Sequence, residues 1–166
     1  GVSSAASDVY KRQPVQLVCP PNLMFMYMPS HLNHMIFELM KNSLRAVVER
    51  YGVEREDHYP PIKVIVVEGK EDITIKISDE GGGIPRSEVP LVWTYTYTTA
   101  RPDDLDPDFQ TSDFLAPMAG FGYGLPLARL YARYFGGDLK LISMEGYGTD
   151  VYLHLNRLSS SSEPLP

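Results

Sequence analysis

The hydrophobic pattern of this chain changes its period several times, and the order of these changes limits the possible folds more than any other feature. Residues 62–68 form a nearly continuous β-branched run, which is typical of a buried strand. Residues 72–78 alternate, with isoleucine at every second position, and the intervening Gly69-Lys70-Glu71 predicts a hairpin. Residues 138–144 and 149–155 predict a second hairpin.

Two other segments follow the period of an α-helix. Ser30 is a candidate N-cap for a helix over residues 31–51, and Gly52 is well suited to end it. Residues 125–135 carry apolar side chains at helical spacing and precede two glycines, which predicts a second helix. Each helix must bury one apolar face against another element.

The remaining segments are short or aperiodic. Residues 14–19 and 23–28 predict two short extended pieces. Residues 81–124 are rich in glycine, proline and acids, which predicts a long loop with one short helix near residues 88–95. The full order predicts a two-layer α/β (α+β) sandwich, in which one mixed sheet has its helices on one face.

Size and charge exclude several classes of protein. A chain of 166 residues that is 43% hydrophobic suits one domain, expected at residues 14–158, with 1–13 and 159–166 as tails outside the fold. The net charge of -6 argues against nucleic-acid binding, and no apolar stretch is long enough to span a membrane. Cys19 is the one cysteine, so no intrachain disulfide can form, and its apolar neighbours predict a buried thiol.

One face of the first predicted helix gathers polar groups. On a helical wheel, His34, Glu38, Asn42 and Arg45 fall within about 80° of one another. A solvated face with ordinary ion pairs is one interpretation. The other is a functional site, because the carboxylate can act as a base, the imidazole can hydrogen-bond it, and the amide oxygen suits Mg²⁺.

Two glycine-rich segments stand where ligands often bind. Asp79-Glu80-Gly81-Gly82-Gly83 follows the alternating strand, either as a flexible turn or as a loop whose aspartate accepts a hydrogen bond from a ring amine. Gly120-Phe121-Gly122-Tyr123-Gly124-Leu125 opens a helix, where free amides favour phosphate. The sequence lacks a P-loop, conventional protein-kinase motifs and a zinc-ligand spacing, and no strand precedes the second segment as a dinucleotide fingerprint requires.

Four separated elements occur in one order, and together they carry a family resemblance: Glu38-x3-Asn42-x2-Arg45-Ala46, Asp79-x-Gly81-x-Gly83, Gly120-x-Gly122-x-Gly124 and Gly146-x-Gly148-Thr149. This order resembles the Bergerat-type (GHKL) superfamily of gyrase, the heat-shock chaperone, histidine kinases and mismatch-repair ATPases. Within that superfamily the chain looks like the mitochondrial pyruvate dehydrogenase kinases, on residues 30–39, 94–100, 119–126 and 131–139.

The resemblance implies transfer of a phosphoryl group from MgATP to serine on the alpha subunit of pyruvate dehydrogenase. It makes Glu38 the catalytic base and His34 its hydrogen-bonded partner. Asn42 is then the Mg²⁺ ligand, and Arg45 lies near the phosphates. The family also uses a potassium ion (K⁺) near the nucleotide.

The resemblance assigns the rest of the ATP site as well. Asp79 reads the adenine amine with help from the Thr149 hydroxyl. The other expected ATP-binding residues belong to the glycine segments and to an ATP lid over about 93–122: Gly81, Gly83, Tyr97, Thr98, Thr99, Gly120, Phe121, Gly122, Tyr123, Gly124 and Leu125. Such a lid would exclude water from the transferred phosphate.

Partners and location are also expectations from the resemblance. It implies a homodimer in the mitochondrial matrix, attached to the lipoyl-bearing core of the complex through an N-terminal helical domain that this chain lacks. The branched-chain ketoacid dehydrogenase kinases share all four elements and remain an alternative. A histidine kinase would need an upstream phosphoacceptor helix, and a chaperone-like ATPase would bind ATP without transferring phosphate to serine.

Overall fold

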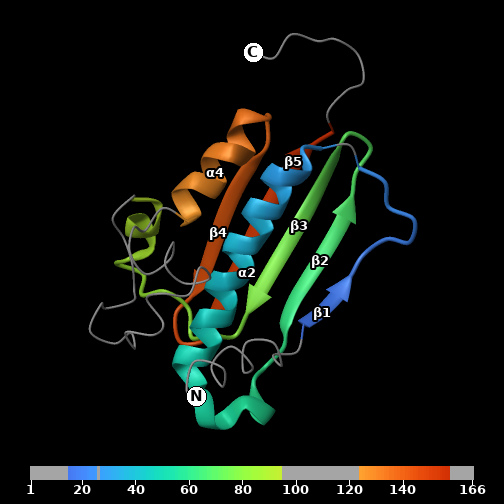
Figure 1. Cartoon of the computed structure of the whole chain (residues 1–166). Helices are drawn as coiled ribbons and strands as arrows, with labels where there is room; N and C mark the ends of the chain where they lie inside the picture. The colour runs from blue at the N-terminus through green and yellow to red at the C-terminus, as the bar shows by residue number, and fades with distance from the viewer. Residues whose placement is uncertain (1–14, 26, 95–123, 158–166) are drawn as a thin grey trace.

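The computed structural model describes residues 15–25, 27–94 and 124–157, with the side chains of 55–57 left aside. Two helices cover one face of a five-stranded sheet, which makes a two-layer α/β sandwich (Figure 1). The strands are β1 (Val15–Val18), β2 (Ile62–Glu68), β3 (Asp72–Asp79), β4 (Asp138–Met144) and β5 (Gly148–Asn156). The helices are α2 (Pro29–Tyr51) and α4 (Gly124–Tyr134), with short 3-10 turns η1 (Val53–His58) and η2 (Val89–Trp93).

The sheet is mixed and follows the order β1-β2-β3-β5-β4. β1 runs parallel to β2, and the other neighbours are antiparallel. The inner strand β3 pairs with β5 along its whole length, and the last pair of that ladder is Asp79 with Thr149. The topology therefore puts two residues from distant parts of the sequence side by side at one end of the sheet.

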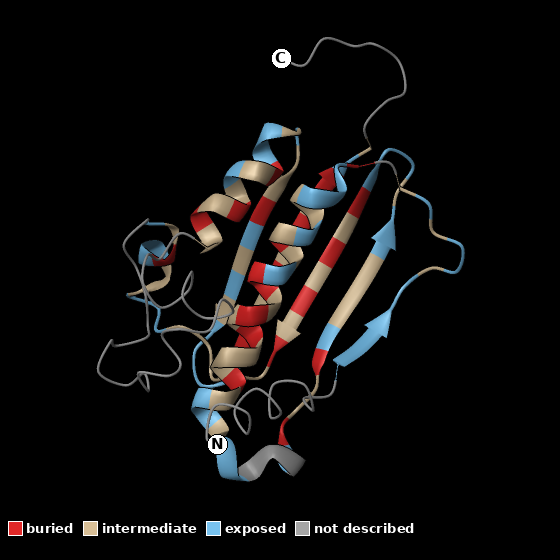
Figure 2. Cartoon of the chain, viewed as in Figure 1, coloured by how far each residue is buried: buried red, intermediate tan, exposed pale blue. Residues whose placement is uncertain are grey.

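The core lies between the sheet and the two helices (Figure 2). Ile73, Ile75 and Ile77 of β3 point toward the helices and are buried, as their alternation predicts. Met35 and Leu39 of α2 pack against this face with almost no exposed surface. On α4 the corresponding positions include two fully buried alanines, whose small size lets α4 pack closely against its neighbours.

The first helix begins two residues earlier than its sequence predicts. Met28 is the N-cap, Pro29 occupies the first turn and Ser30 lies inside the helix, so the prediction of a Ser30 cap is wrong. Proline is favoured at a helix start because its missing amide would have no intrahelical partner there. Gly52 ends the helix with φ of 79°, as predicted.

Three other expectations need correction. β2 is not buried on both faces: Val64 and Val66 pack on the core, whereas Val67 is 58% exposed because no described element covers the far side of the sheet. Cys19 is exposed rather than buried, since it follows the exposed edge strand β1. Among the described positions of 23–28 there is no strand, and the short helix expected near 88–95 is the 3-10 turn η2.

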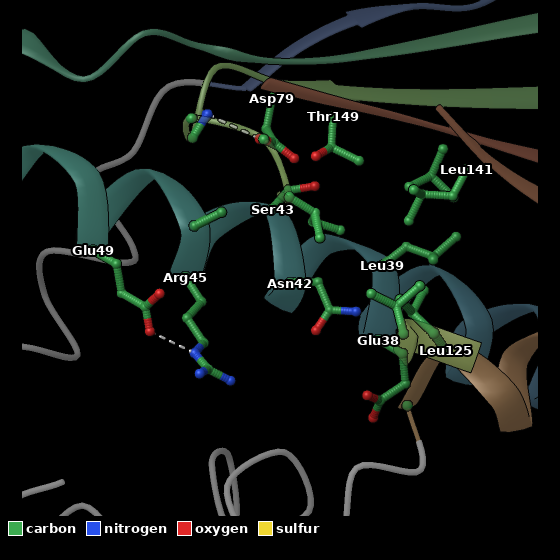
Figure 3. Close-up of a pocket in the computed structure, with 18 of the residues that line it drawn as sticks. Glu38, Leu39, Asn42, Ser43, Arg45, Glu49, Asp79, Leu125, Leu141 and Thr149 are labelled. Carbon is green, nitrogen blue, oxygen red and sulfur yellow. Dashed lines mark hydrogen bonds and ion pairs between the residues drawn. The ribbon is translucent and has the colours of Figure 1, made fainter. Parts of the chain in front are cut away.

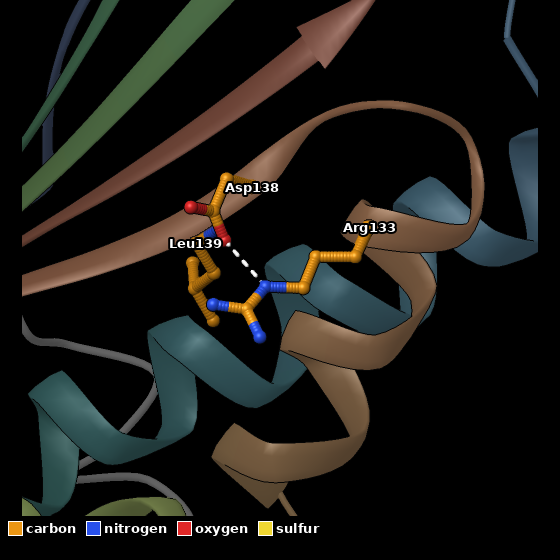
Figure 4. Close-up of polar contacts among 3 residues, drawn as sticks. All are labelled: Arg133, Asp138 and Leu139. Carbon is orange, nitrogen blue, oxygen red and sulfur yellow. Dashed lines mark hydrogen bonds and ion pairs between the residues drawn. The ribbon is translucent and has the colours of Figure 1, made fainter.

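An ion pair fixes the far end of α4 to the start of β4. Arg133 Nε donates to Asp138 Oδ1 at 2.9 Å, and the same oxygen accepts the Leu139 amide at 2.8 Å (Figure 4). Partial burial alone would raise the pKa of Asp138, but these hydrogen bonds outweigh it and lower the pKa. In the described part of the chain, neither helix has the length and apolar character needed to cross a bilayer.

Candidate functional site

A cavity of about 490 Å³ opens between α2 and the ends of β3 and β5 (Figure 3). Its volume is in the range that holds a small-molecule ligand or cofactor. The predicted site residues that line it come from both layers: Glu38, Asn42, Arg45, Asp79, Gly81, Gly83, Gly124, Leu125 and Thr149. We call the region of Asp79, Ser43 and Thr149 the Asp79 end, and the region of Glu38, Asn42 and Gly124 the Glu38 end.

The Asp79 end is held by the sheet and by the adjoining turn. Asp79 is only 6% exposed, and its Oδ1 accepts the Gly81 amide at 2.9 Å. The Ser43 hydroxyl and the Thr149 amide also hydrogen-bond its carboxylate. A buried carboxylate with several donors is fixed in direction, and it can present its remaining acceptor capacity to a ligand amine.

Burial sets the ionisation of this carboxyl group. Desolvation raises the pKa of Asp79 to about 6, against the lowering effect of the hydrogen bonds from Gly81, Ser43 and Thr149. Asp150, the next residue on β5, adds a small repulsion in the same direction as burial. A ligand that donates a hydrogen bond would favour the charged form, so binding and ionisation of Asp79 are coupled.

At the Glu38 end, a buried ion pair replaces the contact that the sequence predicts. Glu38 Oε1 lies 3.2 Å from Lys41 Nζ, and both residues are almost fully buried. The structure records no hydrogen bond between His34 and Glu38 among the described residues. The His34 ring instead contacts Tyr131 edge-on at 5.4 Å, and its buried Nε2 has no hydrogen-bond partner there. In this structure the Glu38 carboxylate is therefore paired with Lys41 and not with the His34 imidazole.

Asn42 and Arg45 extend the polar stripe of α2 along the cavity. The Asn42 side chain lies between Glu38 and Arg45 on the same side of the helix (Figure 3). Arg45 Nε binds Glu49 Oε1 at 2.8 Å, one turn further on. Ordinary ion pairs thus form on this stripe, and side chains of the same stripe line the cavity.

The start of α4 closes the Glu38 end. A Cβ at Gly124 would lie 2.8 Å from Glu38 Oε2, so a larger residue there would require the Glu38 carboxylate to shift. The first amides of an α-helix lack intrahelical partners and attract anions. The other predicted residues of this segment and of the lid lie outside the described residues: Tyr97, Thr98, Thr99, Gly120, Phe121, Gly122 and Tyr123.

Sequence reasoning missed several residues of the cavity. Ser43 falls on the apolar side of the helical wheel, and its small polar side chain amid core residues is the signal that could have revealed it. Arg50 also lines the cavity, but nothing in its local sequence separates it from a solvated arginine. The apolar walls come from Leu39, Ile84, Val92, Leu141 and Val151, which are spread over five elements or turns.

The donor set limits which metal could bind here. The described residues contain no cluster of three or more His, Cys, Asp or Glu side chains able to hold a metal ion. The cavity offers the Asn42 amide as a hard oxygen donor, close to the ion-paired Glu38. One protein ligand fits Mg²⁺, which keeps most of its waters and binds nucleotide phosphates, and it does not fit a protein-caged metal.

Residues 28–159 match the family model described as "Histidine kinase-, DNA gyrase B-, and HSP90-like ATPase". The chain belongs to this ATPase family. The match runs from the residue before α2 to just beyond β5, and so it includes both helices and the strands that form the cavity. The family shown by the comparison is the superfamily that the four sequence elements predict.

Similarity to individual proteins is more specific than the match to the family. The chain is 62% identical to the mitochondrial [pyruvate dehydrogenase (acetyl-transferring)] kinase of Schizosaccharomyces pombe, over 96% of this chain and 38% of the relative. It is 60% identical to the protein of that name from Arabidopsis thaliana, over 88% of this chain and 40% of the relative. It is 53% identical to isozyme 3 of the mitochondrial kinase of that name from Homo sapiens, over 93% of this chain and 35% of the relative. The chain thus spans about two-fifths of the length of these relatives.

Proposed function

We propose that this chain is the ATP-binding catalytic domain of a pyruvate dehydrogenase kinase, which transfers the γ-phosphoryl group of ATP to serine on the alpha subunit of pyruvate dehydrogenase. The observation that carries the proposal is that Glu38 and Asn42 of α2 line the same cavity as Asp79 and Thr149 of the sheet. The names of the three relatives support the choice of substrate.

The two ends of the cavity suit the two ends of the nucleotide. Asp79 accepts the adenine amine, the Thr149 hydroxyl assists it, and the apolar walls cover the ring. The phosphates extend toward the amides at the start of α4, where Gly124 and Leu125 line the cavity. Arg45 lies on the same side of α2 as Asn42 and attracts negative charge to that region.

Asn42 would hold Mg²⁺ through its amide oxygen. When bound, the ion neutralises charge on the phosphates and fixes their orientation. The ATPase family to which the chain belongs implies that the ligand is ATP, whereas Mg²⁺ and a nearby K⁺ are part of the proposal. Phosphoryl transfer needs positioning and charge neutralisation more than covalent chemistry, which is why so few polar groups suffice.

Glu38 accepts the proton of the substrate hydroxyl. The burial of Glu38 beside Gly124 removes water from around its carboxylate, and the ion pair with Lys41 fixes the orientation of that carboxylate. His34 lies one turn earlier on α2, and its buried Nε2 has no hydrogen-bond partner among the described residues. The imidazole can therefore hydrogen-bond the Glu38 carboxylate when the ion pair with Lys41 breaks. Glu38 and His34 are therefore the proposed catalytic pair.

In the parent protein we expect the partners that the resemblance implies. These are a second copy in a homodimer, the alpha subunit as substrate, and the lipoyl-bearing core of the complex bound through an N-terminal domain. The relatives are named mitochondrial, and the proposal extends this to the matrix.

One labelling experiment tests the function. The intact parent protein is incubated with radiolabelled ATP in two separate reactions. One contains the purified pyruvate dehydrogenase complex, and the other contains the purified branched-chain ketoacid dehydrogenase complex. Acid-stable label on the pyruvate dehydrogenase alpha subunit is expected, because phosphoserine survives acid. Label on the branched-chain complex alone, acid-labile label on the kinase itself, or hydrolysis without any labelled protein would each contradict the proposal.

A further inference from the structure

Arg50, in the last turn of α2, reaches two glycine turns at one end of the sheet: residues 80–83, which follow β3, and residues 145–148, which join β4 to β5. Its Nη1 donates to the Glu80 carbonyl at 3.1 Å and to the Tyr147 carbonyl at 2.8 Å. Its Nη2 donates to the Gly146 carbonyl at 3.0 Å. One exposed side chain thus satisfies three backbone acceptors that lie up to 97 residues away in sequence.

The two turns are also bonded to each other. The Gly82 amide donates to the Tyr147 carbonyl at 3.0 Å, and the Gly146 amide donates to the Gly82 carbonyl at 2.7 Å. At Gly81 a Cβ would lie 2.5 Å from the Cβ of Ala46, so the first turn packs directly on α2. The turns form one unit. Arg50 ties this unit to α2 through the turn carbonyls, and Ser43 of the same helix hydrogen-bonds the neighbouring Asp79 carboxylate.

This unit determines where the ligand-facing residues lie. The first turn continues from Asp79 and the second leads into Thr149, and these two residues are cross-strand partners. The helix to which Arg50 belongs carries Glu38 and Asn42. The arginine therefore connects the turns beside the Asp79 end to the helix that carries the Glu38 end, although it need not touch a ligand itself.

We infer that Arg50 is a positioning residue for nucleotide binding, which sets the Asp79 end at the correct distance from the phosphate-binding groups of α2. The inference rests on the proposed nucleotide site. The planar guanidinium is needed because it can direct donors at three carbonyls at once, which a lysine ammonium on a flexible stem cannot do with the same geometry. Its charge also suits the C-terminal end of a helix.

The test compares Arg50→Met and Arg50→Lys with the unchanged 166-residue chain. Binding of ADP with Mg²⁺ is measured by calorimetry, thermal unfolding is followed in the absence of nucleotide, and amide exchange is measured at Gly82 and Gly146. Arg133→Met is the matched control, because Arg133 is another exposed arginine, whose ion pair with Asp138 lies away from the cavity.

Arg50→Met and Arg50→Lys are each expected to weaken ADP binding about tenfold, while Arg133→Met stays within about twofold. Exchange should rise at Gly82 and Gly146 only, with melting temperatures close to that of the control. Unchanged ADP affinity in Arg50→Met, or an affinity loss that accompanies faster exchange throughout the sheet, would overturn the inference. Full affinity in Arg50→Lys would show that charge alone suffices and would also overturn it. If the unchanged chain does not bind ADP, the proposed function fails and the inference fails with it.

Discussion

The two ends of the cavity differ in the kind of contact that holds their residues in place. At the Asp79 end the contacts are backbone amides and carbonyls of paired strands and glycine turns, completed by Ser43 and Arg50. At the Glu38 end and along the adjoining polar stripe of α2 they are mainly side chains of one helix, paired by charge as Glu38 with Lys41 and Arg45 with Glu49. The first end is held by the topology of the fold, whereas the second depends on pairs that a ligand can rearrange.

This difference suggests a division of labour. Backbone contacts fixed by strand pairing are suited to recognising a flat ring, because they hardly move when a ligand enters. Ion pairs within a helix compensate charge in the empty cavity and can be exchanged when phosphates and a metal arrive. In the proposed function, rigid recognition and adjustable chemistry are therefore separated along a single cavity.

The largest expected effect is on chemistry at the Glu38 end. Glu38→Gln in the parent protein should lower serine phosphorylation about 10²- to 10⁴-fold, because a glutamine cannot accept the proton. Nucleotide affinity should be unchanged or tighter, since a negative charge near the phosphates is removed. Glu71→Gln is the control and should keep its activity, because Glu71 is exposed in the turn before β3, at the opposite end of that strand from Asp79. Full phosphorylation by Glu38→Gln would exclude this residue as the base.

At the Asp79 end the expected effect is on stability. The pKa of Asp79 in the fold is about 6, above its ordinary 3.8, so ionisation costs more in the folded state than in the unfolded state. Its contribution to stability is therefore complete below the ordinary value and is lost as the pH rises through about 6. Between about pH 4 and pH 7 the unchanged chain should lose up to about 3 kcal/mol of unfolding free energy relative to Asp79→Asn.

Urea unfolding of both proteins at several pH values measures this difference directly. Subtracting the Asp79→Asn curve removes the contributions of all other titrating groups. If the two proteins show parallel pH profiles, Asp79 titrates at its ordinary value and the account of its burial is wrong.

Substituting alanine for the closely packed glycine at the Asp79 end should cause a smaller loss of unfolding free energy than the pH change does. A Cβ at Gly148 would overlap the Asp79 carbonyl, so Gly148→Ala should lower the unfolding free energy by about 1–3 kcal/mol. In the same turn, Gly146 has open space around it and φ of 83°, so Gly146→Ala should cost only the backbone strain of about 1 kcal/mol. Urea unfolding ranks the two. A larger loss for Gly146→Ala would mean that conformation, not close packing, determines the geometry of this turn.

The smallest effect is expected for the ion pair between Arg45 and Glu49. Because Glu49 is 53% exposed, a double-mutant cycle with Arg45→Met and Glu49→Gln should give a coupling energy of only about 0.3–0.5 kcal/mol. Chemical unfolding of the four proteins measures it. A coupling above about 1 kcal/mol would show that this pair is a rigid part of the site and would blur the contrast between the two ends.

Local sequence was informative wherever one element acts alone. The alternation of Ile73, Ile75 and Ile77 predicts both the strand β3 and its buried face. Helical spacing predicts that Glu38 and Asn42 share a face of α2, and both line the cavity. Local signals were weaker at boundaries, because Pro29 and Ser30 can each start a helix and only the packed structure selects between them.

Pairing between distant segments was beyond local reasoning. The sequence shows an imidazole, a carboxylate and a lysine on one helix, but which of His34 and Lys41 holds Glu38 depends on rotamers and on the neighbouring Tyr131. Likewise, the role of Arg50 is defined by carbonyl groups that local sequence does not place near it.

By itself, the sequence determined the order of the elements, the positions of the proposed functional groups along the chain and the family, since these depend on periodicity and on motif spacing. The tertiary structure alone decided which face of β2 is open, that Cys19 is exposed, and how Arg50 joins the two glycine turns. The physical reason is that burial, charge pairing and hydrogen bonding across the sheet depend on distances in space, and the chain fixes those distances only once it has folded.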